Sequence, residues 1–175
     1  SYISVLPYNE LGAAAAAYNA DENELCRLDE IYSAVKTPFE IRSGSEKVTR
    51  RFFKICNNGQ ESFTGLYKNL TEQGICKGHQ CIAYGLYMRD NGIELSEGLA
   101  VYGYSICSAI VTNCVKLVPL SQLAGQKILG ESFELISSAS EKALFTDIND
   151  IGISGAGFDL RAMQHERLYS RQYMS

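Results

Sequence analysis

The longest regular pattern of apolar residues in this chain lies between positions 95 and 117. Its apolar side chains recur at three-, four- or seven-residue spacing, which places them on one stripe of an α-helix. The stripe consists of Leu95, Leu99, Tyr102, Ile106, Ile110 and Leu117. Because the other faces carry small residues, we expect a helix that is central in the fold and buried on several sides. It should end before Pro119, since the residue preceding a proline avoids the helical region.

The rest of the chain is divided into helices by prolines, glycines and short polar stretches. The predicted helices span residues 7–18, 22–35, 38–56, 63–72, 78–89, 119–136 and 159–173. Residues 146–157, which are rich in glycine and aspartate, are expected to form a loop. No segment alternates convincingly between apolar and polar residues, as a strand would. The pattern therefore predicts an all-α fold, a single-domain helical bundle with short loops.

The clearest helix start is the sequence Thr37-Pro38-Phe39-Glu40. Thr37 can cap the helix, Pro38 suits the first helical position, and Glu40 can reach back to the capping residue. We expect these residues to form a capping box at the start of the helix over residues 38–56.

Length, composition and charge restrict the classes of protein to consider. A chain of 175 residues fits one compact domain, residues 1–175, and its 46% hydrophobic and 21% charged residues are typical of a globular protein. The net charge of −4 gives no general attraction for nucleic acid or anionic lipid. We therefore expect no nucleic-acid partner.

One uncharged run, residues 98–115, is at the lower limit of length for a membrane span. It contains several tyrosine, serine, threonine and asparagine residues and lacks a strong basic flank. We therefore favour a buried helix and expect no membrane association. No signal peptide is visible, and the six cysteines are interpreted as free thiols in a reducing compartment. These features favour a cytoplasmic location.

A search for catalytic motifs finds almost nothing. The chain has two histidines, no Gly-x-Ser-x-Gly elbow, no His-Glu-x-x-His pair and no Walker A loop. A Ser-His-Asp or Cys-His set can also be assembled from residues that are distant in the sequence. A helical enzyme is thus an alternative with thin support, and we expect a protein without enzymatic activity that does not bind GTP by itself.

A metal site is the more specific alternative. The segment from Cys76 to Cys81 holds two thiols and His79 within six residues, and thiolate and imidazole suit zinc or nickel. One hypothesis is therefore a helical protein that binds nickel or zinc directly through Cys76, His79 and Cys81. The competing interpretation is a buried Cys81 and a His79 that is hydrogen-bonded to backbone at a helix start. The second interpretation is favoured because no further pair of ligands completes a tetrahedral set.

The last segment, residues 159–175, combines large apolar side chains with interleaved arginines. Chain ends usually carry small polar residues, whereas tyrosine, methionine and arginine are enriched at protein interfaces. The segment either docks on its own domain or is a tail that becomes ordered on a partner.

Four blocks of sequence resemble one family. Residues 118–126, Val-Pro-Leu-Ser-Gln followed by Gly125-Gln126, resemble a family run V-P-L-G/S-Q-x-x-G-Q, and residues 163–171 resemble its H-E-x-x-Y-S-R tail. Residues 40–51 and 79–85 match two weaker helical blocks. The chain resembles the UreF family of urease accessory proteins, and the tail suggests a relative of the epsilon-proteobacterial members. Two departures are the absent N-terminal block and Thr49, which replaces a usual glycine.

The resemblance implies an all-helical protein, often a dimer, that binds UreD/UreH and with it recruits the GTPase UreG. The complex then activates apo-urease with nickel, so we expect no tightly bound cofactor in this chain. The resemblance places Tyr104 on the helix of the dimer interface. The tail that contacts UreD/UreH contains His165, Glu166, Tyr169, Ser170 and Arg171. The run that shapes an internal path or supports the surface facing UreG contains Gln122, Gly125 and Gln126. His79, Cys81 and His165 are the candidates for direct contact with nickel.

Overall fold

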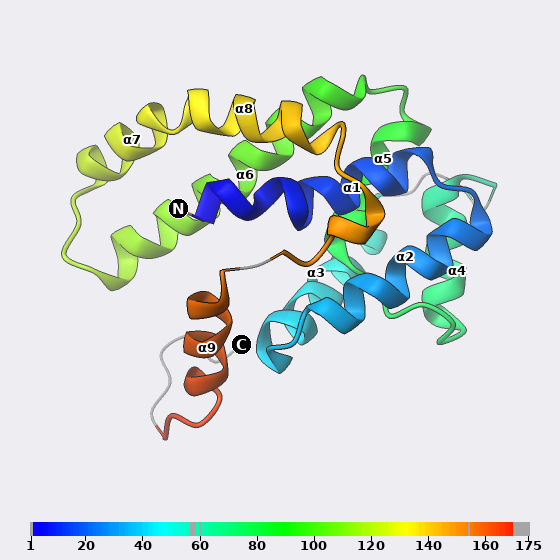
Figure 1. Cartoon of the computed structure of the whole chain (residues 1–175), viewed down its shortest axis with the longest axis horizontal. Helices are drawn as coiled ribbons and strands as arrows, with labels where there is room; N and C mark the ends of the chain where they lie inside the picture. Colours follow the sequence, from blue (N-terminus) through cyan, green and yellow to red (C-terminus); the bar gives the residue numbers. More distant parts are fainter. Residues whose placement is uncertain (1, 57–58, 60, 154, 170–175) are drawn as a thin grey trace.

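A computed structural model describes residues 2–56, 59, 61–153 and 155–169 (Figure 1). Within these ranges the chain forms α-helices and short 3-10 helices and no strand. The elements in chain order are η1 (Tyr2–Tyr8), α1 (Glu10–Asn19), α2 (Glu22–Val35), α3 (Phe39–Ile55), α4 (Phe63–Glu72), α5 (Gln80–Asp90), α6 (Leu95–Leu117), α7 (Gln122–Glu131), α8 (Phe133–Ala143), η2 (Ile148–Asp150) and α9 (Ala156–His165). The prediction of an all-α bundle is confirmed.

Helix α1 lies at the centre of the fold, where it contacts α2, α5, α6 and α8 (Figure 1). Its closest neighbour is α5. A Cβ atom built on Gly85 of α5 would lie 2.2 Å from the carbonyl oxygen of Ala14. The two backbones therefore nearly touch, because the alanine run of α1 and the missing side chain at Gly85 leave nothing between them. Apolar side chains such as Leu11 and Ile82 fill the core around this crossing.

Helix α6 has the predicted bounds, but its N-terminal half holds most of its buried residues. Gly98, Leu99, Tyr102 and Cys107 belong to the interior, whereas Ile110 is 40% exposed. The second half of α6 packs against α7, where Gly125 lies close to Val111 and Val115, and Figure 1 shows these two helix segments extending from the bundle as an arm. The prediction that α6 is buried on several sides is thus wrong for its second half. By length and composition alone α6 is apolar enough to cross a bilayer, and 28% of its most apolar window is buried.

The predicted helix over residues 119–136 is two helices. Helix α7 begins after Ser121, whose hydroxyl accepts a hydrogen bond from the Ala124 amide. It ends at Glu131 and is followed by Ser132, whose hydroxyl donates to the carbonyl oxygen of Ile128. Side-chain bonds of this kind compete with the helical ladder and bend it. Helix α8 then continues beyond the predicted end, as far as Ala143.

The start of the chain and the predicted loop over residues 146–157 also differ from expectation. Residues 2–8, where the predicted helix begins at Pro7, form a 3-10 helix, and the α-helix starts at Glu10. Asn9 at this junction donates hydrogen bonds to the carbonyl oxygens of Val5 and Ile153. The predicted loop over residues 146–157 contains η2 and the first two residues of α9. The loop and the start of the chain are thus tied together.

Candidate partner-binding surfaces

Helix α9 carries the first part of the predicted tail. It begins at Ala156, three residues earlier than predicted, and it ends at His165. Residues 166–169 are not helical, so the prediction of a helix to residue 173 is wrong there, and Ser170 and Arg171 lie outside the described residues. No residue of α9 is buried; Phe158, Leu160 and Tyr169 all expose most of their surface. The tail therefore presents apolar side chains to the outside.

Polar contacts join this tail to the start of α3. The Glu166 carboxylate accepts hydrogen bonds from the backbone amides of Phe39 (2.8 Å) and Glu40 (3.4 Å). The Nδ1 atom of His165 lies 2.7 Å from a carboxylate oxygen of Glu40. A carboxylate is favourable here because a helix N-terminus has unpaired N–H groups and partial positive charge. We call the three side chains of Glu40, His165 and Glu166 the clasp.

The predicted capping box at the start of α3 is consequently wrong. Pro38 is the capping residue, its backbone is extended, and no side chain of the segment caps the helix. Glu40 bonds to His165 instead of reaching back, and Glu166, 127 residues away in sequence from Phe39, supplies the acceptor. Further along α3, Thr49 is fully buried, and its hydroxyl donates to the carbonyl oxygen of Ser45.

A second exposed apolar surface covers the arm. The ring of Tyr104 on α6 stacks on Phe133 of α8, with centroids 5.6 Å apart and an interplanar angle of 5°. The α6–α8 surface consists of the exposed residues Val101, Tyr104, Ile110, Leu117, Val118, Leu123, Ile128, Phe133 and Leu135. Large apolar side chains that stay exposed in this number make these three helices candidates for an interaction surface.

The run after Pro119 divides into a packing residue and two surface residues. Gly125 is buried, and a Cβ atom built on it would lie 2.7 Å from Cγ2 of Val115. It therefore allows α7 to lie close against α6. Gln122 and Gln126 are exposed. Their exposure fits a surface role better than a role in lining an internal path.

The segment from Cys76 to Cys81 does not assemble a metal centre. His79 is fully buried, its Nε2 lies 2.8 Å from the Ser33 hydroxyl, and its Nδ1 lies 3.4 Å from the Ser45 hydroxyl. Burial lowers the pKa of His79 to about 4, so the imidazole is neutral at pH 7. The histidine is buried and hydrogen-bonded, as the second interpretation held, but its ring contacts hydroxyl groups rather than backbone.

The two thiols of this segment have separate surroundings. Cys81 is buried, and burial raises its pKa to about 12. Cys76 lies instead beside Cys26, with the two sulfur atoms 3.9 Å apart. All six cysteines are free, as predicted. In the described ranges no three metal-ligating side chains of histidine, cysteine, aspartate or glutamate come together.

Asp29 is a structural residue that sequence reasoning missed. Its carboxylate is buried in α2 and accepts hydrogen bonds from the Tyr67 hydroxyl (2.6 Å) and from the amides of Lys77 (2.7 Å) and Gly78 (3.1 Å). It thereby fixes the turn that leads into His79. The signal that could have found it is its helical spacing, because Asp29 falls on the apolar face of α2 together with Leu25, Leu28 and Tyr32.

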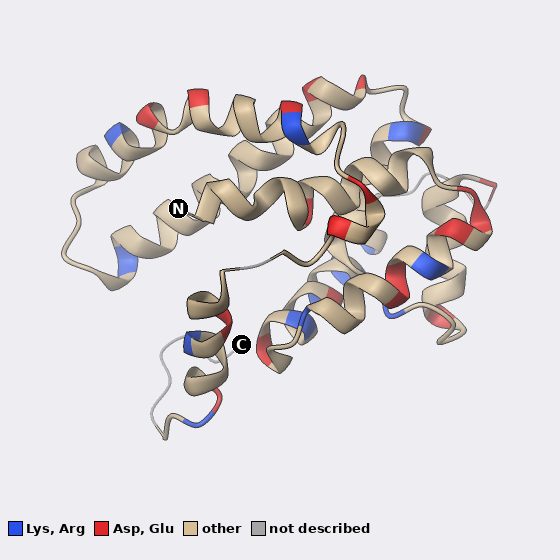
Figure 2. Cartoon of the chain, viewed as in Figure 1, with Lys and Arg blue, Asp and Glu red and all other residues tan. Residues whose placement is uncertain are grey.

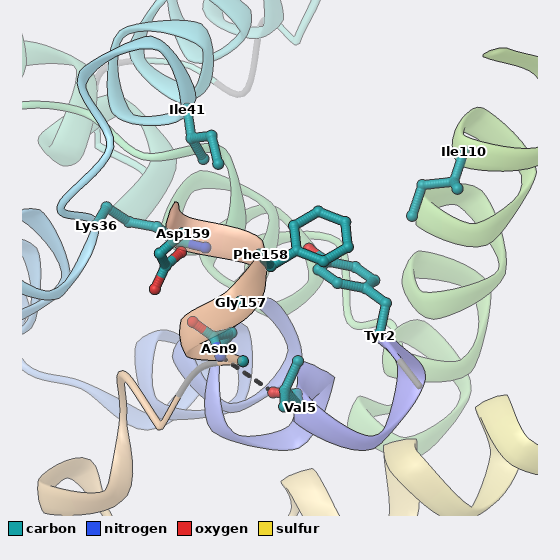
Figure 3. Close-up of a pocket in the computed structure, with 10 residues that line it drawn as sticks. Tyr2, Val5, Asn9, Lys36, Ile41, Ile110, Gly157, Phe158 and Asp159 are labelled. Atoms are coloured by element: carbon teal, nitrogen blue, oxygen red, sulfur yellow. Dashed lines mark hydrogen bonds between the residues drawn. The ribbon is translucent and has the colours of Figure 1, made fainter. Parts of the chain in front are cut away.

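A hollow of about 570 Å³ lies between η1, α6, α9 and the start of α3. Figure 3 shows the ring of Phe158 against Tyr2, with Ile41 and Ile110 on either side. Lys36 and Asp159 are the charged residues of its lining. Figure 2 shows acidic and basic residues on several of the helices.

These features define an all-helical protein whose conspicuous surfaces are exposed apolar faces suited to other proteins. Comparison with known proteins identifies the family. A model of the UreF family matches residues 4–132. The urease accessory protein UreF of Actinobacillus pleuropneumoniae is 32% identical over 173 residues, which cover 96% of this chain and 76% of the relative. The UreF of Haemophilus influenzae is 34% identical over 174 residues, covering 96% and 74%. The chain belongs to the UreF family of urease accessory proteins.

Proposed function

We propose that this chain is a non-catalytic scaffold of urease maturation. With UreD/UreH it recruits the GTPase UreG, and the assembly supports insertion of nickel into apo-urease. The observation that carries the proposal is the tail of this UreF family member, where α9 has no buried residue, ends at His165 and is followed by Glu166. A surface of this kind acts through binding energy, by holding partners in one geometry and shifting their populations.

The exposed surfaces are assigned to different partners. The tail, with His165, Glu166, Tyr169 and the following Ser170 and Arg171, contacts UreD/UreH. The α6–α8 surface, centred on Tyr104 and its stacked partner, joins two copies of the chain as a homodimer. The exposed Gln122 and Gln126, held against α6 through the packing of Gly125, support the surface that faces UreG.

Nickel is the cargo of the assembly rather than a resident cofactor of this chain. His79 and Cys81, the candidate ligands, are buried and engaged with Ser33 and Tyr32. The free thiols and the urease context favour the cytoplasm, where the assembly works without a membrane or nucleic acid.

Co-purification with UreD/UreH tests the assignment of the tail. We expect a chain that ends at Met163 to lose the complex while its far-ultraviolet circular dichroism stays helical. The matched control is Gln126→Ala, which leaves the tail intact and should retain UreD/UreH. Normal complex formation by the truncated chain would contradict the assignment.

A further inference from the structure

We propose that Cys26 and Cys76 form a modification site, where a hydroperoxide such as hydrogen peroxide converts the two thiols into a reversible disulfide. The bond links α2 to the turn between α4 and α5. All six cysteines are free in the structure, so the reduced thiols are the starting state. In a reducing compartment, disulfides are mostly transient and serve catalysis or redox sensing. The inference goes beyond the proposed function and does not depend on it.

The two thiols lie next to each other although 50 residues separate them in the chain. The Cys76 thiol donates a hydrogen bond to the sulfur atom of Cys26, with the two sulfur atoms 3.9 Å apart. A disulfide bond is about 2.05 Å long, so the sulfur atoms have to approach by about 2 Å, a shift within the range of a side-chain torsion. No other two cysteines among the described residues form such a contact.

The backbone around Cys76 is fixed from two sides. Its own amide donates to the carbonyl oxygen of Leu70 in α4 (3.2 Å), and the amides of the next two residues donate to the Asp29 carboxylate. Asp29 lies three residues after Cys26 in α2, and residues at this spacing share one face of a helix. The carboxylate that binds the turn therefore also holds Cys76 against Cys26.

Access from solvent differs between the two thiols. Cys26 is half-buried and lines a surface hollow of about 420 Å³, whereas Cys76 is only 2% exposed. Burial and the neighbouring Asp29 raise the pKa of the Cys76 thiol, which therefore stays protonated. Exposure and thiolate character decide which cysteine a peroxide oxidises first. We therefore assign the first step to Cys26 and the second to Cys76.

The reaction consumes one molecule of peroxide for each disulfide. The sulfur atom of Cys26 attacks a peroxide oxygen, the O–O bond breaks, and the thiol proton leaves with the departing oxygen as water. The product is a sulfenic acid on Cys26. The sulfur atom of Cys76 then attacks this sulfur, the S–S bond forms as the S–O bond breaks, and the Cys76 proton leaves with the hydroxyl group as a second water. The two sulfur atoms are oxidised and the peroxide oxygens are reduced.

Peptide mapping of the oxidised protein tests the pairing. The full-length protein is treated with hydrogen peroxide, its remaining thiols are blocked with N-ethylmaleimide, and its peptides are mapped by mass spectrometry without reduction. We expect a cross-link between Cys26 and Cys76 within one chain, with the loss of two free thiols. Dithiothreitol should restore both thiols. Oxidation of the urea-unfolded protein should spread cross-links over several cysteines, because the folded structure selects this pair.

Single substitutions test the assigned order. In Cys76→Ser, the Cys26 thiol should accumulate as a sulfenic acid, which dimedone traps. In Cys26→Ser, the Cys76 thiol should remain unmodified, because it is buried. The matched control is Cys56→Ser, which removes another half-buried thiol. This control should form the cross-link to the same extent as the wild type.

The wild-type map decides the proposal without any substitution, so a variant that fails to fold does not affect it. Absence of the cross-link in the folded wild type overturns the proposal, and so does a cross-link that joins two chains. Oxidation of Cys26 beyond the sulfenic acid while Cys76 stays a thiol also overturns it. Trapping of a sulfenic acid on Cys76 in Cys26→Ser, at the rate seen for Cys26, would overturn the assigned order.

Discussion

Gly85→Ala places a methyl group at the closest backbone contact of the fold. The new Cβ atom would lie 2.2 Å from the carbonyl oxygen of Ala14 and about 3 Å from the two carbon atoms beside it. Ordinary contacts of a Cβ atom begin at 3.4 Å. Helices α1 and α5 must therefore separate by about 1 Å, because the obstacle is backbone and cannot rotate away.

The cost of this separation is set by the core around the crossing. Leu11, Ala13 and Ala14 are completely buried, so moving α1 loosens contacts along the whole interface. Overpacking of this kind costs about 3–5 kcal/mol at a rigid site. The better helix propensity of alanine offsets about 1 kcal/mol of that cost. We expect a net loss of about 2–4 kcal/mol in the free energy of unfolding.

Gly44→Ala is the matched control. Gly44 lies inside α3, and a Cβ atom there meets nothing within 4 Å. The same chemical change should therefore stabilise the protein by about 0.5–1 kcal/mol. Equilibrium urea denaturation followed by far-ultraviolet circular dichroism measures both variants. Wild-type stability for Gly85→Ala would refute the close approach of α1 and α5.

Three further predictions concern the buried polar groups and nickel. Asp29→Ala leaves the Tyr67 hydroxyl and the amides of Lys77 and Gly78 without their acceptor in the interior. We expect the free energy of unfolding, measured by urea denaturation, to fall by about 3 kcal/mol or more. The pKa of His79 is about 4 in the folded protein, against an ordinary value of 6.5 for a solvated histidine, so the unfolded chain binds more protons between these two pH values. The contribution of His79 to the free energy of unfolding should therefore fall by about 3 kcal/mol as the pH drops from 6.5 to 4. In His79→Gln the free energy of unfolding should depend less on pH over this range. The same pH dependence in the variant and the wild type would contradict the lowered pKa of His79. Replacing both Cys76 and Cys81 with serine should leave nickel binding unchanged in equilibrium dialysis, and a loss of binding would revive the direct metal site.

The sequence predicts helices well here because their signals are local. The apolar stripe of α6 and the prolines around it depend on neighbours within a few turns, and the bounds of α6 match the prediction. The capping box at Thr37 failed for the opposite reason. Its local chemistry is sound, but a carboxylate more than a hundred residues away occupies the helix start. A local sequence pattern does not show whether a side chain from a distant part of the chain will cap the helix instead.

The sequence predicts only in part which apolar residues are packed inside the fold and which are exposed. Alanines at positions 13–17 favour a helix in any context, but their role in close packing depends on Gly85, which the sequence alone does not place opposite them. Likewise, the pattern of α6 identifies an apolar helix without saying which half is covered. Its second half is exposed because α7 packs on it while α8, η1 and α1 lie against other parts of the fold. Tertiary arrangement therefore decides which apolar residues are core and which are interface.

Reconstitution of urease activation tests the central claim most directly. Apo-urease, UreD/UreH, UreG, GTP and nickel are combined with and without this protein in its full-length form, and urease activity is followed. We predict that activity appears only when the protein is present, and that the protein alone turns over neither GTP nor urea. Activation that is equally complete without it, or turnover by the isolated protein, would contradict its role as a non-catalytic scaffold.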